Sequence, residues 1–159
     1  MPIVKPAELP ASLPRGKRLM ALDLGTRTIG MAITDPGLTR ASPVGTIRRT
    51  RLAADLAALA REAGAWDVGA FLLGLPLNMD GKWGPAADRI RSFADELVKS
   101  TGVVPGEPVL ALWDERLTSF EAEERMSEAG LSARRRRDQV DAAAAAVILE
   151  DFLASLPRG

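Results

Sequence analysis

Three carboxylates stand where the pattern of the chain could build a metal site. Asp23 lies near the end of the apolar run Leu19–Leu24. Glu115 follows a second apolar run, Val109–Trp113, and Asp141 lies in the first turn of the last predicted helix. An ionised carboxylate beside apolar residues is costly unless it is paired or binds a metal. Oxygen ligands suit hard cations such as Mg²⁺ or Mn²⁺, and two such ions about 3.5–4 Å apart can promote phosphodiester cleavage.

The chain contains no His and no Cys. This absence excludes Ser-His and Cys-His catalytic groups, His-ligated zinc or iron, and disulfides. Any chemistry must therefore use carboxylates, Lys, Arg, hydroxyl groups or the backbone. The lack of Cys also weakly favours the cytoplasm.

Each carboxylate also has a purely structural interpretation. Asp23 could shape a hairpin turn, and Glu115 could pair with Arg116 or Arg125 at the surface. Asp141 could stabilise the positive end of a helix dipole, an effect of about 0.3–1 kcal/mol. Taken one at a time, these interpretations compete evenly with a metal site or outweigh it.

Other polar residues near these positions leave similar alternatives open. Asp138 precedes Asp141 by three residues and could be a fourth ligand or a helix cap. Asn78 and Asp80 lie in a glycine-containing loop, where they could be ordinary turn residues or touch a substrate. The unbroken run of four arginines at 134–137 could be solvated charge or could hold phosphates.

The predicted elements bring the carboxylates to one edge of a sheet. Strands are predicted at 19–24, 29–34, 42–47, 70–73 and 109–113, and helices from 52, 85, 118 and about 138. This order favours an α/β fold, with a mixed five-stranded sheet and helices on both faces. Ligands of such sheets bind at the carboxyl ends of the strands. Asp23 and Glu115 are expected at that edge, with Asp141 facing it from the last helix.

Composition predicts one ordinary globular domain. Residues 1–17 hold four spaced prolines and are predicted to be a flexible or extended arm, which leaves 18–159 as a single domain. The net charge is zero, so any binding of nucleic acid would depend on local patches such as Arg48, Arg49 and Arg51. No apolar run reaches the roughly 20 residues of a membrane helix, so no membrane partner is expected.

Four motifs in order resemble the YqgF/RuvX family of the ribonuclease H-like superfamily, a branch related to bacterial Holliday-junction resolvases. They are ALDLGTRTIGMAITD, LLGLPLNMDGKWGPAADRIRSFADEL, LWDERLTSFEAEERM and RDQVDAAAAAVILEDFL. The similarity spans about Leu19–Leu153. It implies a ribonuclease H-like fold with Asp23, Glu115 and Asp141 as the catalytic, metal-binding acids.

The resemblance further implies a metal-dependent nuclease that uses Mg²⁺ or Mn²⁺, with two ions, on structured nucleic acid. Members of the family are assigned to 5′-end processing of precursor 16S rRNA and were earlier proposed as Holliday junction resolvases. The first motif departs from the family pattern, because Arg27 is followed by Thr28 where two basic residues often occur. The positions expected to contact substrate are Arg27, Asn78, Arg116, Arg134, Arg135, Arg136 and Arg137.

Two rival hypotheses come from other functional classes. DLGT resembles a phosphate loop of actin-like ATPases, but those proteins need two such domains and this chain is too short for them. A binding module without catalysis would gain nothing from acids that repel phosphate. The choice between RNA and DNA stays open: symmetric junction cleavage needs two active sites and hence a homodimer, whereas rRNA trimming does not.

Overall fold

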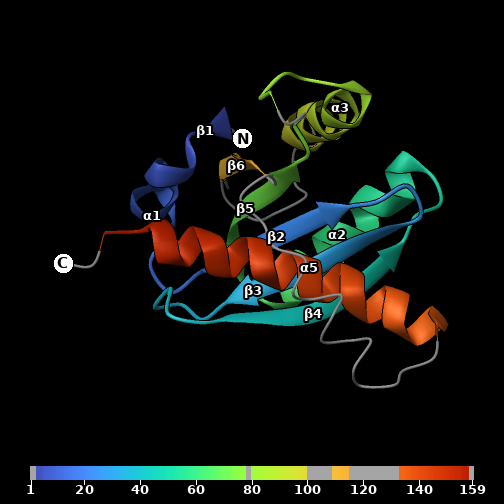
Figure 1. Ribbon diagram of the computed structural model, residues 1–159. Helices are drawn as coiled ribbons and strands as arrows, with labels where there is room; N and C mark the ends of the chain where they lie inside the picture. The colour runs from blue at the N-terminus through green and yellow to red at the C-terminus, as the bar shows by residue number, and fades with distance from the viewer. Residues whose placement is uncertain (1–2, 78–79, 100–108, 115–132, 158–159) are drawn as a thin grey trace.

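A computed structural model describes residues 3–77, 80–99, 109–114 and 133–157, and for 133–141 it describes the helical backbone alone. Within these ranges the chain forms one sheet with helices on both faces (Figure 1). The strands are β1 (Ile3–Val4), β2 (Arg18–Leu24), β3 (Thr28–Thr34), β4 (Ala41–Arg48), β5 (Val68–Leu75) and β6 (Val109–Asp114). The helices are η1 (Pro6–Glu8, a 3₁₀ helix), α1 (Leu9–Ser12), α2 (Leu52–Ala65), α3 (Pro85–Lys99) and α5 (Ala133–Ser155).

The sheet is mixed, with the strand order β1-β6-β5-β2-β3-β4. β1, β6, β5 and β2 pair in parallel, whereas β2, β3 and β4 pair antiparallel. The carboxyl ends of β2, β5 and β6 therefore lie at the same edge. All five predicted strands are present, and the predicted α/β class is confirmed.

Within the arm that was expected to be flexible or extended, residues 3–12 form a strand and two short helices that the sequence did not predict. β1 adds a sixth strand beside β6, where Ile3 pairs with Leu110. Proline occupies an early position in each of the short helices η1 and α1, where its missing N–H removes no helical hydrogen bond. Leu9 anchors the segment, because its side chain is only 1% exposed. The domain division after residue 17 stays a prediction.

The two faces of the sheet build two cores. Met20 and Leu22 pack on the face covered by α2 and α3, with the α3 stripe of Ile90, Phe93 and Leu97. The alternate strand positions face α5 in a second cluster that includes Trp113 and Phe152, whose rings meet edge to face at 5.9 Å. Figure 1 shows α5 lying across β2, β3 and β4.

Helix α5 begins earlier than the sequence pattern predicted. The last helix was predicted only from about residue 138, but α5 already starts at Ala133 and thus includes the four arginines. Arginine has a high helix propensity, and neither Gly nor Pro interrupts this run. The helix predicted from Thr118 lies outside the described residues. Across the described ranges, no helix has the length and apolarity needed to cross a membrane.

Candidate active site

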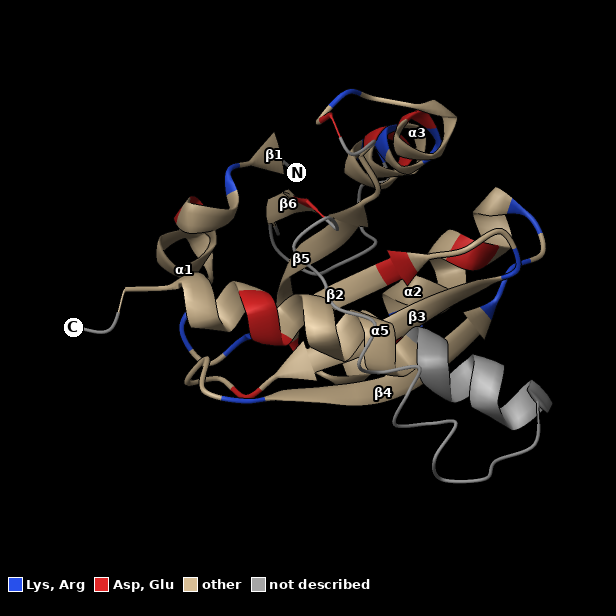
Figure 2. Ribbon diagram, viewed as in Figure 1, with Lys and Arg blue, Asp and Glu red and all other residues tan. Residues whose placement is uncertain are grey.

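Asp23 lies near the carboxyl end of β2 and is partly buried. It is the one acidic residue of that strand, and Figure 2 shows it in red at the arrowhead of β2. Strand alternation puts Asp23 on the same face as Leu19 and Ala21, which pack in the α5 cluster. Its cross-strand neighbour is Gly30, which adds no side chain beside the carboxylate. The acid therefore lies on the α5 face at the ligand-binding edge of the sheet.

The other two predicted acids are placed less fully. β6 ends at Asp114, which pairs with Leu75 of β5, so Glu115 continues the chain from that same edge. Glu115 itself lies outside the described residues. Asp141 is in the helical backbone of α5, and its side chain is not described. Where side chains are described, no three acidic, His or Cys residues are grouped closely enough to hold a metal. The convergence of the three acids stays a prediction.

The structure describes only some of the residues predicted to contact the substrate. Arg27 is exposed in the β2–β3 turn, four residues after Asp23. The positions 134–137 lie in the first turns of α5, with their side chains outside the described set. Asn78 and Arg116 fall outside the described residues. Of the expected phosphate contacts, Arg27 alone has a described side chain, and it lies at the same end of β2 as Asp23.

Arg49 stabilises the turn after Asp23. The sequence indicated this residue only as part of a basic cluster. Gly25 N donates to Thr28 O at 2.8 Å and closes the turn. Arg49 Nη1 donates to Gly25 O at 2.8 Å, and Arg49 N donates to Arg27 O at 2.7 Å. Arg49, which follows the last residue of β4, thus binds two carbonyl groups of the turn.

Arg49 is itself held by a buried carboxylate. Its Nε lies 3.5 Å from Asp55 Oδ2, and the Asp55 side chain is 3% exposed. Thr50 N donates to Asp55 Oδ1 at 3.0 Å. The guanidinium also lies over the Phe93 ring, 5.8 Å from its centroid. The turn is consequently connected through Arg49 to both α2 and α3.

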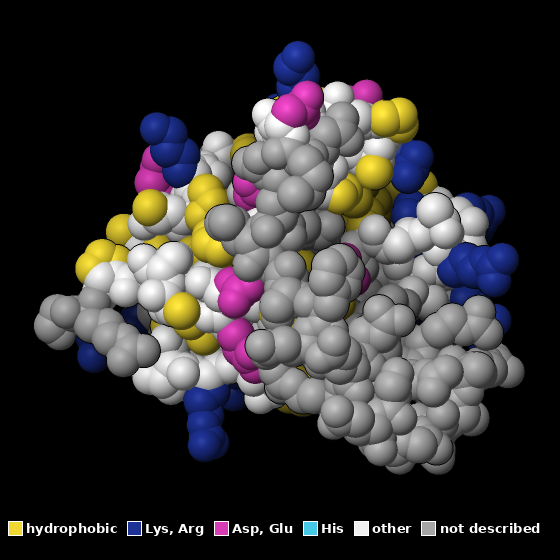
Figure 3. All heavy atoms as spheres, in the orientation of Figure 1, with side chains coloured by type: hydrophobic (Ala, Val, Ile, Leu, Met, Phe, Trp, Pro, Cys, Tyr) yellow, Lys and Arg dark blue, Asp and Glu magenta, His cyan; other side chains and the backbone are white. Residues whose placement is uncertain are grey.

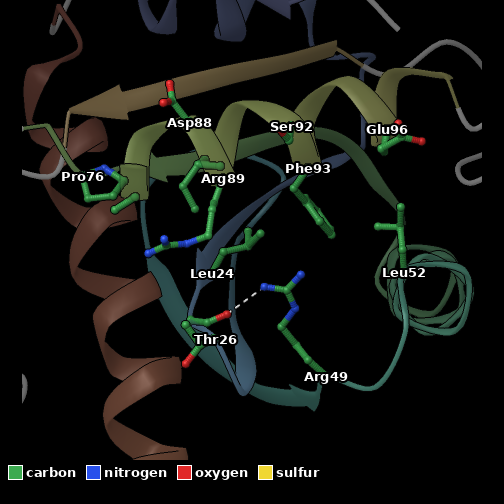
Figure 4. Close-up of a pocket in the computed structure, with 13 residues that line it drawn as sticks. Leu24, Thr26, Arg49, Leu52, Pro76, Asp88, Arg89, Ser92, Phe93 and Glu96 are labelled. Atoms are coloured by element: carbon green, nitrogen blue, oxygen red, sulfur yellow. Dashed lines mark hydrogen bonds between the residues drawn. The ribbon is translucent and has the colours of Figure 1, made fainter. Parts of the chain in front are cut away.

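A pocket of about 630 Å³ opens beside this turn (Figure 4). Its walls come from the turn, from Arg49 and from α3. The residues that line it are Leu24, Gly25, Thr26, Arg49, Leu52, Pro76, Ala86, Asp88, Arg89, Ile90, Ser92, Phe93 and Glu96. Leu24 and Asp23 are neighbours in β2, so their side chains point to opposite faces of the sheet. The pocket therefore lies on the α3 face, and the Asp23 carboxylate lies on the other face at the same strand end.

The sequence profile of the RuvX family, described as Holliday junction resolvase, matches residues 17–155. This protein belongs to the RuvX family. A relative from Rhodospirillum centenum is 48% identical over 152 residues, which cover 96% of this chain and 81% of that protein. One from Myxococcus xanthus is 50% identical over 137 residues, covering 86% and 87%. Both carry the name "Putative pre-16S rRNA nuclease".

Solved structures place this RuvX-family chain in the ribonuclease H-like fold. Thermus thermophilus RuvC in complex with Holliday junction substrate superposes with a TM-score of 0.54 at 14% identity, covering 87% of this chain and 94% of that one. A second Thermus thermophilus RuvC structure gives a TM-score of 0.50 at 13% identity, covering 86% and 95%. At these identities the likeness concerns the fold alone, and it confirms the fold predicted from the motifs.

The donor set of this RuvX-family protein fits a hard divalent cation. The predicted ligands are all carboxylates, and the sequence offers no His or Cys that would favour zinc or iron. Asp23 meets the main structural requirement, since this partly buried residue lies at the strand end where ligands of such sheets bind.

Sequence reasoning missed Arg49 and Arg89, the two cations of the pocket. The pairing of Arg49 with Asp55 had a faint signal, because Asp55 lies in the first turn of a predicted helix just after a basic cluster. Arg89 had none, since it is one of several charged residues on the polar side of α3.

Proposed function

We propose that this protein is a divalent-metal-dependent nuclease that hydrolyses phosphodiester bonds in structured nucleic acid, and that its substrate is the 5′ region of precursor 16S rRNA. The observation that carries the proposal is the match to relatives of that name over nearly the whole chain. The position of Asp23, at the ligand-binding edge of a ribonuclease H-like sheet, supports it.

In this proposal Asp23, Glu115 and Asp141 hold one or two Mg²⁺ or Mn²⁺ ions. When bound, the ions would supply an activated water and stabilise the leaving oxygen. The exposed Arg27 would contact the strand close to the cut. Arg116 and the arginines at 134–137 would hold phosphates further along, and Asn78 would line the groove.

Cleavage of the Holliday junction is the second candidate. It is favoured by the description of the matching family and by the fold shared with a RuvC that holds a junction substrate. This function would require a homodimer, because two symmetric cuts need two active sites. Trimming of rRNA has no such requirement, and the cytoplasm is the compartment expected for either role.

The test is cleavage by purified protein in Mg²⁺ or Mn²⁺, with a precursor 16S leader RNA and a synthetic four-way DNA junction assayed side by side. We expect cutting of the RNA, loss of cutting in EDTA, and an intact junction. Paired symmetric nicks in the junction alone would establish the second candidate instead. No cleavage of either substrate under any metal would contradict both.

Three substitutions test the three predicted metal ligands one at a time. Asp23→Asn, Glu115→Gln and Asp141→Asn should each abolish cleavage while leaving the thermal unfolding midpoint close to that of the unmodified protein. Full activity in any one of them would remove that residue from the site. Asp138→Asn tests for a fourth ligand, since loss of cleavage would add Asp138 to the site. The alternative of a helix cap is wrong, because α5 begins at Ala133 and Asp138 lies inside the helix.

A further inference from the structure

The pocket beside the β2–β3 turn has two cationic walls (Figure 4). Arg89 reaches into it from α3, and Arg49 reaches in from the opposite side. The apolar surface between them comes from Leu24, Leu52 and Phe93. Such walls reduce solvent screening, so a cation here attracts an anion more strongly than it would on an open surface.

The two guanidinium groups retain capacity for a ligand. The exposed Arg89 side chain has no hydrogen bond or ion pair with any residue that the structure describes. Arg91 on the same helix differs, because its Nε lies 3.2 Å from Asp95 Oδ1. Arg49 directs Nη1 to Gly25 O and Nε towards Asp55, which uses only part of the five donors of a guanidinium.

The acidic residues of the pocket lie at its edges. Asp88 is among the lining residues, and in Figure 4 its carboxylate points away from Arg49 and Leu24. Glu96 lies at the far end, where Lys99 Nζ is 3.9 Å from its carboxylate. Outside the pocket, Arg27, Arg48 and Arg51 are exposed, and Figure 3 shows basic side chains gathered along this margin of the molecule. The local field therefore favours a polyanion that arrives from the surface.

We propose that this pocket binds a backbone phosphate of the substrate strand, away from the phosphate that is cut. The strand would pass around the end of β2, with its scissile phosphate on the Asp23 face and a second phosphate between Arg89 and Arg49. Guanidinium groups recognise phosphate oxygens through paired hydrogen bonds, and the apolar wall suits the adjoining sugar. The identity of the strand rests on the proposed function, whereas the phosphate site rests on the pocket.

Arg89→Ala tests the site, with Arg91→Ala as its matched control two residues along the same helix. Binding of labelled leader RNA and junction DNA is measured in EDTA, so that cleavage does not interfere, across a salt series of about 50–200 mM. We expect Arg89→Ala to weaken binding about tenfold. It should also reduce the salt slope by about 0.7–0.9, the value for one lost phosphate contact. Arg91→Ala should stay within about twofold of the unmodified protein.

A neutral phosphate locates the contact on the strand. Single methylphosphonate substitutions are moved along the substrate, and one position should lower affinity in the unmodified protein but not in Arg89→Ala. Such non-additivity is the mark of a direct contact. Steady-state cleavage adds a second readout, since a remote phosphate contact should raise KM and leave kcat nearly unchanged.

The outcomes separate the pocket from the proposed function. Equal effects of Arg89→Ala and Arg91→Ala, with cleavage intact in the unmodified protein, would overturn the phosphate site and leave the nuclease standing. Arg89-dependent binding without metal-dependent cleavage would support the site and overturn the nuclease. Absence of both binding and metal-dependent cleavage, with either nucleic acid, would overturn both.

Discussion

The two hairpin turns of the antiparallel part of the sheet each follow an aspartate, and they are built in different ways. In the β3–β4 turn, Asp35 Oδ1 accepts from Thr39 N and Arg40 N, each at 2.8 Å. Asp35 Oδ2 accepts from Thr39 Oγ1 at 2.6 Å. These bonds, the Thr39 hydroxyl foremost, lower the pKa of Asp35 from its ordinary 3.8 to about 2. The turn is closed by its own residues.

The β2–β3 turn is held from outside. Arg49, which lies more than twenty residues further along the chain, bonds to the carbonyls of Gly25 and Arg27, and buried Asp55 holds Arg49 in turn. A turn that only reverses the chain needs no such support. We infer that the β2–β3 turn is fastened because it sets the positions of Asp23 and Arg27, whereas the β3–β4 turn serves the fold.

The largest expected effect is a difference in kcat between variants of Asp23 and Asp35. Asp23→Asn should lower kcat at least about 1,000-fold, because loss of a metal ligand removes several kcal/mol of transition-state stabilisation. Asp35→Asn should stay within about twofold, since its carboxylate bonds only within its own turn. Cleavage assays on both variants, with unfolding monitored in parallel, check the contrast. A comparable loss of kcat in the two variants would contradict the distinction between a catalytic Asp23 and a structural Asp35.

Asp55→Ala should have the next largest effect, on stability. It leaves Arg49 without its carboxylate and Thr50 N without its acceptor in a largely buried place. We expect a loss of about 2–3 kcal/mol in the free energy of unfolding, measured by urea denaturation. A change below about 0.5 kcal/mol would show that the pair is incidental.

Arg49→Lys should reduce kcat about tenfold and also raise KM, because Arg49 both holds the β2–β3 turn and lines the proposed phosphate site. Lysine keeps the charge, but its single ammonium cannot reproduce the planar fork that reaches Gly25 O and Asp55 together. Steady-state kinetics distinguish this result from that of Arg89→Ala, in which KM should rise while kcat stays nearly unchanged. A rise in KM with unchanged kcat would mean that Arg49 acts only as a substrate contact and not through the turn.

Asp35→Asn should have the smallest effect, and it should depend on pH. Because the folded-state pKa is lowered, the ionised form stabilises the protein above about pH 4, and this contribution is lost as the pH falls towards 2. At pH 7 the variant should be less stable by about 1 kcal/mol. The difference should shrink at pH 2, as measured by denaturation at both values, and a difference independent of pH would contradict this origin.

The sequence predicted the features that follow local periodicity. The strands predicted at 19–24 and 70–73 lie within β2 and β5, and the helix predicted from residue 85 begins at Pro85. β1 was missed because a two-residue strand carries no periodicity and depends on the exposed edge of β6. The early start of α5 was missed because the run of four arginines carries no apolar periodicity.

The supporting contacts of the site were beyond sequence reasoning for a physical reason. Arg49 meets Gly25 and Phe93 only because the sheet brings β4 beside β3 and α3 over its end. No pattern within one element marks such contacts between segments. Arg89 and Arg91 look equivalent in sequence, and only the packing of α3 turns one into the pocket and leaves the other to pair with Asp95.

The central claim is that Asp23, Glu115 and Asp141 meet at a metal ion beside the fastened turn. In this test Fe²⁺ is supplied in place of that ion; bound there, it would react with peroxide, with ascorbate as the reductant, to give hydroxyl radicals that cut the nearby polypeptide. We expect cuts in three separated segments, around residues 23, 115 and 141, with none in the Asp35–Arg40 turn, and loss of all three in Asp23→Asn. Cuts confined to other segments, or cuts at 115 and 141 that persist in Asp23→Asn, would contradict it.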